Sequence, residues 1–154
     1  MYFSLIFISE GFPISQPILL EKLIQKLHDV LLLHEDILLA YLYGSYIDGG
    51  WKSTSDIDVG IVVRPSAMLD HWYSIKIKNE LEDALEGNYI IDLRILNDRS
   101  PQFQYNVIFN HPRILIRDEQ FRVEFECKVL MIWYDLQPSY EQFYSERNEV
   151  LNRI

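Results

Sequence analysis

The spacing of apolar residues along the chain predicts helices and strands that alternate. An amphipathic helix is predicted over about 17–34, because apolar residues recur there at three- and four-residue steps and Pro17 suits a first helical turn. Residues 37–43 and 56–63 are short apolar runs that Gly44 and Pro65 close, as is typical of buried strands. A second amphipathic helix over 69–85 and a third apolar run over 89–96 follow. The first two thirds of the chain therefore read as helix, strand, strand, helix, strand.

The last third of the chain is predicted to be mainly helical. A short helical stretch follows Pro101, and 114–116 is a small extended segment. Asp118 is a suitable cap for a long helix, on which we expect Cys127 to be a small buried residue. We expect Pro138 to open a separate last helix. The apolar face of the long helix carries Phe121, Phe125, Val129, Ile132 and Trp133.

The chain contains no internal repeat and no linker that would divide it into domains. With 154 residues, of which 49% are apolar, it can bury a core of its own. We therefore predict a single α/β (α+β) domain over 1–154. It has a small mixed sheet flanked by helices, an N-terminal extension over 1–16 and a helical tail over 118–154.

Charge and cysteine content narrow the range of functions. The chain has 14 Lys plus Arg and 23 Asp plus Glu, so its formal net charge is −9. Such a chain is repelled by phosphate backbones and anionic lipids, which predicts no direct nucleic-acid or membrane binding. The apolar start, residues 2–8, is far shorter than the roughly 20 residues of a membrane span. A lone Cys127 cannot form an intrachain disulfide, which favours a cytoplasmic protein.

Two aspartates at the start of the second strand are the first candidates for chemistry. Asp56 and Asp58 are two residues apart, so on a strand they share a face about 6.6 Å apart at ~3.3 Å per residue. Two such carboxylates repel each other unless a divalent cation binds between them. Oxygen ligands with no neighbouring His or Cys favour Mg²⁺, with Mn²⁺ as the second choice.

Further polar residues lie where the other strands begin or end. Asp92 stands inside the third apolar run, where a charge is expensive unless it meets the metal or a cation. Three carboxylates on neighbouring strands suit phosphoryl transfer, in which two ions often act together. Gly44 lets backbone approach a phosphate, and the Ser45 hydroxyl adds a donor.

These residues resemble a known signature. Gly44-Ser45, ten intervening residues and Asp56-Ile57-Asp58 are similar to the GS-x10-DxD motif of nucleotidyltransferases of the DNA polymerase beta type, with Asp92 as the third acid. The tail from Ile114 to Pro138 resembles that of the minimal nucleotidyltransferase (MNT) antitoxins of the MntA type. The resemblance extends over about 18–150.

The resemblance implies a polymerase-beta-like fold and a specific reaction. Similar proteins move AMP from Mg-ATP to a tyrosine hydroxyl of a cognate HEPN-domain ribonuclease toxin and so inactivate it. By this analogy Asp56 and Asp58 hold the metals, and Asp92 shares a metal and acts as the base. The residues expected to bind the nucleotide are Gly44, Ser45, Lys52 and Ser55.

Two alternatives stay open. The chain could be an antitoxin that neutralises its toxin by binding alone, with a vestigial metal site. It could also be a nucleotidyltransferase that modifies a small molecule, although that activity usually needs an additional helical domain to hold the acceptor. A neighbouring gene for a small all-α protein with an R-x4-6-H motif would favour either antitoxin function.

Overall fold

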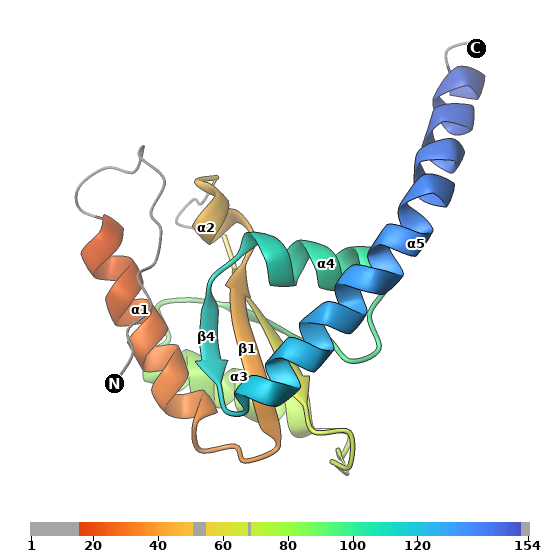
Figure 1. The fold of residues 1–154 in the computed structure, drawn as a ribbon. Helices are drawn as coiled ribbons and strands as arrows, with labels where there is room; N and C mark the ends of the chain where they lie inside the picture. Colours follow the sequence, from red (N-terminus) through yellow and green to blue (C-terminus); the bar gives the residue numbers. More distant parts are fainter. Residues whose placement is uncertain (1–15, 51–54, 68, 152–154) are drawn as a thin grey trace.

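A four-stranded mixed sheet forms the centre of the fold in the computed structural model, which describes residues 16–50, 55–67 and 69–151 (Figure 1). The strand order is β3-β2-β1-β4. β1 runs antiparallel to both β2 and β4, and β2 and β3 are parallel. The predicted mixed α/β fold is therefore confirmed. The strands are β1 (Ile37–Tyr43), β2 (Ile57–Val63), β3 (Ile91–Ile95) and β4 (Arg113–Ile116).

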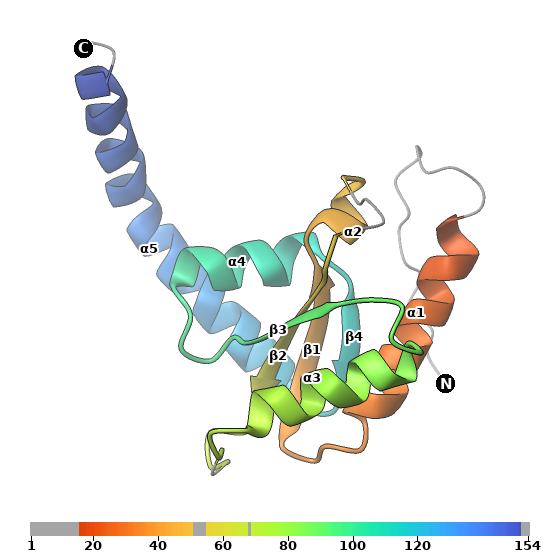
Figure 2. The same cartoon turned by 180° about the vertical axis from the view of Figure 1, so that it is seen from behind.

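Helices cover both faces of the sheet, as the two opposite views show (Figures 1 and 2). One face packs against α1 (Gln16–Leu31) and α3 (Tyr73–Ala84), which bury residues such as Leu27 and Leu81. The other face packs against α4 (Pro101–Asn110) and the first half of α5 (Glu119–Leu151). A single turn, α2 (Ser45–Asp48), joins β1 to β2 at one end of the sheet.

Most predicted elements are present, with shifts at their ends. β1 has the predicted bounds, and β3 is shorter than the predicted 89–96. α1 ends before residue 34 because the chain turns tightly, with the Leu33 amide donating to the Val30 carbonyl at 3.1 Å. Asp118 is the predicted cap of α5, since its Oδ1 accepts from the Phe121 amide at 2.9 Å. The predicted extension 1–16 lies outside the described residues except for Gln16, which opens α1.

Two predictions about the long helix are wrong. Pro138 does not open a new helix but lies inside α5. A proline removes one backbone donor, and on an exposed helix water can replace it, so the helix continues. Cys127 is exposed, not buried. Phe125 and Val129 face the sheet, and a residue midway between them points to the opposite side of the helix, since each residue turns the chain by about 100°.

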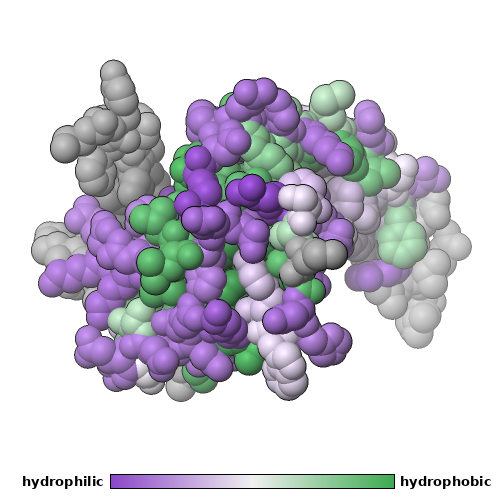
Figure 3. Space-filling view, turned by 90° about the horizontal axis from the view of Figure 1, so that it is seen from below, coloured by the Kyte–Doolittle hydropathy of each residue, from purple (hydrophilic) through white to green (hydrophobic). Residues whose placement is uncertain are grey.

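The second half of α5 projects away from the sheet (Figure 1). Leu136, Phe143 and Tyr144 are among its exposed apolar side chains. Within the described ranges, no helix combines the length and the apolar character that crossing a membrane requires. At the opposite end of the molecule, where β1 begins and β2 ends, the surface is mostly hydrophilic, with hydrophobic patches in between (Figure 3).

Candidate functional site

Three polar side chains form a row across the sheet beside α2. Tyr43 is the register partner of Asp58 across β1 and β2, and Asp58 is the partner of Asp92 across β2 and β3. Register partners on neighbouring strands point to the same face. Tyr43 belongs to the core beneath α4, so all three side chains stand on the α4 face of the sheet. The structure thus brings together Asp58 and Asp92, 34 positions apart in sequence.

Gly44 gives the carboxylate of Asp58 room beside the backbone. Its φ of 77° lies in the left-handed region that favours glycine. A Cβ at this position would overlap Asp58 Oδ2 and would lie 2.9 Å from Asp58 Cγ. A side chain on residue 44 and the observed position of the Asp58 carboxylate therefore exclude each other.

The turn that carries Gly44 and Ser45, two of the predicted nucleotide-binding residues, is tight. α2 opens at Ser45, and two of its amides donate to the Gly44 carbonyl at 3.0 Å each. Gly49 ends the turn with a left-handed φ of 81°. Ser55 is half-buried directly before Asp56, whereas Lys52 lies outside the described residues.

The electrostatics of the row indicate a surplus of negative charge. Burial raises the pKa of Asp58, and the neighbouring carboxylates of Asp92 and Asp56 raise it further, while Arg94 opposes them. Asp56 is exposed and two positions before Asp58, so it lies toward the same face of the strand. A divalent cation would offset this charge, and carboxylate oxygens are the donors that Mg²⁺ prefers.

The described residues include no group of three His, Cys, Asp or Glu side chains already arranged around one point. Instead, Arg94 holds Asp92, with Nε at 2.9 Å and Nη2 at 2.7 Å from the same oxygen, Oδ2. The guanidinium also lies 5.9 Å from the ring centroid of Phe103 on α4. Asp56 and Asp58 are therefore the residues that could hold a metal, and Asp92 could join them through Oδ1, the oxygen to which Arg94 does not donate.

Arg94 is a site residue to which the sequence analysis assigned no role. The expectation that Asp92 must meet the metal or a cation is met by this guanidinium. The sequence did contain a signal for this ion pair, because Asp92 and Arg94 are two residues apart and such residues share a face of a strand.

The sequence analysis also missed Tyr43. Its hydroxyl is buried and has no hydrogen-bond partner among the described residues. The ring lies edge-on to Phe103 at 5.7 Å and to His111 at 6.2 Å between centroids. Burial, and next the charge of Asp58, raise the pKa of Tyr43, so the hydroxyl keeps its proton as a potential donor. Its position directly before Gly44, in register with Asp58, becomes visible only once the strands are paired.

A histidine connects the turn to the rest of the site. His111, which follows α4, lies with Nε2 3.2 Å from Asp48 Oδ1 and with Nδ1 2.9 Å from the Asn106 carbonyl oxygen. The two contacts tie α2 to the segment between α4 and β4. They fix the α2 turn above the row of Tyr43, Asp58 and Asp92.

Comparison with solved structures finds the same fold in toxin–antitoxin complexes. A crystal structure of a toxin–antitoxin with AMP-PNP matches with a TM-score of 0.66 and 22% identity, over 80% of this chain and 96% of that chain. The toxin–antitoxin MntA–HepT matches with a TM-score of 0.62 and 20% identity, over 82% and 97%. A tri-AMPylated Shewanella oneidensis HEPN toxin in complex with MNT antitoxin matches with a TM-score of 0.58 and 22% identity, over 86% and 98%. Comparison with curated proteins gives no match.

The sequence itself matches a family. The profile described as "Polymerase beta, Nucleotidyltransferase" covers residues 25–120. That range contains all four strands. It also contains Gly44, Ser45, Asp56, Asp58 and Asp92. The chain therefore belongs to the polymerase beta nucleotidyltransferase family.

Proposed function

We propose that this chain is an antitoxin that transfers AMP from ATP to a tyrosine hydroxyl of a HEPN ribonuclease toxin and thereby inactivates the toxin. One observation carries the proposal: Asp58 lies beside Asp92 on one face of the sheet and next to the backbone of Gly44, and Asp56 stands two positions before Asp58. The fold is shared with a toxin–antitoxin complex with AMP-PNP and with a complex of a tri-AMPylated HEPN toxin and an MNT antitoxin, which supports the choice of nucleotide and partner. We place the reaction in the cytoplasm.

Asp56 and Asp58 would hold Mg²⁺, or Mn²⁺ as the second choice. Such an ion supplies neutralisation of phosphate charge and lowers the pKa of an attacking hydroxyl. The position of Asp58 depends on Gly44, because any larger residue would displace its carboxylate. The proposed nucleotide site also takes in Ser45, Ser55 and Lys52, of which Lys52 lies outside the described residues.

The protein's own groups then account for the transfer. The acceptor oxygen attacks the α-phosphorus of ATP, the bond from that phosphorus to the bridging oxygen of the β-phosphate breaks, and pyrophosphate leaves. The hydroxyl proton passes to Asp92 Oδ1, which has no hydrogen bond to any described residue. Arg94 holds the other oxygen of Asp92 and so orients the carboxylate.

A second candidate is an antitoxin that only binds its toxin. The observation that favours it is the Arg94–Asp92 ion pair, which supplies the positive charge that Asp92 needs without any metal. The two candidates differ in one measurable property, the mass of the toxin.

The test is the intact mass of a co-expressed HEPN protein after incubation with this chain, ATP and Mg²⁺. We expect a gain of one or more AMP units with the wild type and none with the double variant Asp56→Asn and Asp58→Asn. Asp83→Asn is the matched control, because Asp83 is an exposed carboxylate of α3 on the opposite face of the sheet. It should leave the transfer unchanged.

Two results would overturn the proposal. Transfer that persists in the double aspartate variant would exclude these residues as the metal site. An unchanged toxin mass, together with a stable complex and suppressed ribonuclease activity, would establish the binding-only antitoxin.

A further inference from the structure

Two adjoining cavities form a groove that runs from Arg94, the residue that holds Asp92, to the opposite end of the sheet. We propose that it binds an extended segment of the acceptor protein, which places an apolar side chain between α5 and the β3 edge and acidic side chains against Arg99 and Lys128. This inference rests on the proposed function, since it describes how a protein acceptor is held. It concerns a surface that lies beyond Asp56, Asp58, Asp92 and the Gly44 turn.

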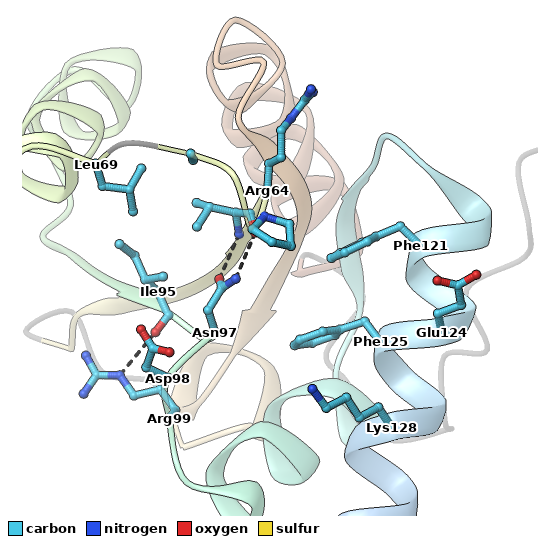
Figure 4. A pocket seen from close by; sticks show the side chains of 13 residues that line it. Arg64, Leu69, Ile95, Asn97, Asp98, Arg99, Phe121, Glu124, Phe125 and Lys128 are labelled. Carbon is cyan, nitrogen blue, oxygen red and sulfur yellow. Dashed lines mark hydrogen bonds between the residues drawn. The ribbon is translucent and has the colours of Figure 1, made fainter.

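The far end of the groove is a cavity of about 760 Å³ between the start of α5 and the ends of β2 and β3. Phe121, Phe125 and Lys128 point into this space from α5, with Leu69 and Ile95 on the opposite wall (Figure 4). The two phenylalanine rings stack with centroids 5.9 Å apart. The two walls together form a slot with apolar side chains on both sides.

The polar group at the base of this cavity is already satisfied. Asn97 donates through Nδ2 to the Val63 carbonyl and accepts at Oδ1 from the Val63 amide, both at 2.9 Å. Its side chain therefore joins the ends of β2 and β3 and offers few groups to a ligand. An apolar side chain that enters the slot leaves no buried polar atom of Asn97 unpaired.

A smaller cavity of about 320 Å³ adjoins the slot and extends toward Arg94. Its walls include Phe103 and Arg94, the residue that binds Asp92. The two cavities share Asp98 and Arg99 in their walls. A segment that fills both would thus begin at the proposed base and end between the phenylalanines and Ile95.

The charges along the groove favour an acidic ligand. Arg64, Arg99 and Lys128 line the larger cavity, and none of them forms an ion pair with a carboxylate among the described residues. Arg64 and Arg99 donate only to backbone carbonyls, each at 3.3 Å. The whole chain has a net charge of −9, but the wall of this cavity carries more basic than acidic residues. The three basic residues face only two acidic ones, Asp98 and Glu124, so the cavity favours an acidic ligand.

The length of the groove sets the spacing of the ligand. Asp92 and Ile95 are three residues apart on β3, about 10 Å at ~3.3 Å per residue. An extended segment advances by a similar amount per residue. The apolar anchor should therefore stand about three residues from the modified hydroxyl, a pattern of anchor and charge that is common in recognition of extended peptides.

Fluorescence anisotropy with a labelled peptide tests the groove directly. The probe is a twelve-residue peptide with one tyrosine, a leucine three residues away and three glutamates, and the titrant is the full chain without ATP or metal. We expect Arg99→Glu with Lys128→Glu to weaken binding at least about tenfold, or about 1.4 kcal/mol. Lys76→Glu is the matched control, because Lys76 is an exposed helical lysine on α3 without an ion pair to any described residue. It should leave the affinity unchanged.

The peptide itself supplies two more comparisons. Replacing its leucine with serine should weaken binding to the wild type, and replacing its glutamates with lysines should reverse the preference between wild type and the double charge variant. Equal binding of all these peptides, or an equal loss in the Lys76→Glu variant, would overturn the proposal. So would the absence of binding to the wild type.

Failure of the groove and failure of the proposed function give different results. The binding measurement needs no transfer, and the Asp56→Asn and Asp58→Asn variant should bind the peptide as the wild type does. A bound peptide with no AMP transfer to the toxin would retain the groove and reject the reaction. AMP transfer without peptide binding would retain the reaction and reject the groove.

Discussion

Gly44 is the residue at which backbone geometry and site chemistry depend on each other. Its left-handed φ already disfavours other residues, and the carboxylate of Asp58 occupies the space that a side chain would need. Gly87 also has a positive φ, of 66°, but nothing lies within 4 Å of the position of its missing Cβ. Substitution of Gly87 should therefore strain the backbone only, whereas substitution of Gly44 should strain the backbone and also displace the Asp58 carboxylate.

We predict that Gly44→Ala lowers the rate of AMP transfer by about 100-fold or more, because a displaced catalytic group costs rates of that order. The Gly87→Ala control should lose a similar free energy of unfolding, about 1–2 kcal/mol, and keep its transfer rate. Urea unfolding and the transfer rate, measured on both variants, check the prediction. Equal rates in the two variants would contradict it.

The second residue-scale prediction concerns the pH dependence of stability. The pKa of Asp58 is raised in the folded protein, so its ionised form is disfavoured there relative to the unfolded chain. This destabilisation is absent below the ordinary carboxyl pKa of 3.8 and grows as pH rises through the raised value. Without metal, Asp58→Asn should therefore stabilise the protein at pH 7, by less than about 1 kcal/mol for a partly exposed charge.

Urea unfolding of the metal-free protein near pH 4 and at pH 7 measures the effect. The gain should appear at pH 7 and largely vanish at the lower pH, and Asp83→Asn should show no gain at either. A loss of stability in the Asp58→Asn variant at pH 7 would mean that the carboxylate is favourably paired.

At the scale of elements, a buried carboxylate attaches α5 to the sheet. Glu126 on α5 accepts from the Tyr41 hydroxyl of β1 at 3.0 Å and from Arg113 of β4 at 2.8 and 2.9 Å. Arg122, one turn earlier on α5, donates to the same carboxylate at 2.7 Å. The carboxylate is only 8% exposed, so these partners replace the water that it has lost.

We predict that Glu126→Gln lowers the free energy of unfolding by about 1.5–3 kcal/mol, the range for hydrogen bonds to charged groups. Glu119→Gln is the control, because Glu119 pairs with Arg122 at the surface. That substitution should leave the stability within experimental error. Chemical denaturation of both variants distinguishes a buried attachment from a surface ion pair, and equal losses would exclude the proposed role of Glu126.

At the scale of the whole molecule, the chain consists of a sheet domain and a projecting helical arm, residues 141–151 of α5 (Figure 1). The ring contacts of the arm stay within it, as in the pair Phe143 and Tyr144. Closer to the sheet, Trp133 stacks on Tyr105 of α4 with centroids 5.2 Å apart. The boundary between domain and arm thus follows these aromatic contacts.

We predict that deletion of residues 141–154 shifts the melting temperature by no more than about 2 °C, because the ring contacts described for the arm lie within it and a segment that projects from the fold contributes little to global stability. A longer deletion that begins at Trp133 removes the stacked ring and should lower the melting temperature clearly. Calorimetry on both deletions measures the difference. A large shift in the shorter deletion would show that the arm stabilises the domain.

The order of the elements was readable from the sequence, and so was the spacing of the two aspartates. Apolar periodicity reflects which side of a helix or strand is buried, so β1 and the cap at Asp118 appear as predicted. The Asp56 and Asp58 pair was recognisable because a spacing of two is a local property of a strand. The prediction for Pro138 was wrong, because helix propensity alone does not show that a long helix can continue past one missing backbone N–H donor.

Which groups surround those aspartates depended on contacts between distant segments. Strand pairing alone places Asp92 and Tyr43 on either side of Asp58, and no local pattern specifies that register. The groove arises in the same way, from β2, β3 and α5 meeting at one end of the sheet. Local patterns reflect which residues of a single element are buried. Distances between elements follow instead from how their buried faces pack. The elements and the spacing of the aspartates were therefore predictable from the sequence, whereas the residues that surround the aspartates were not.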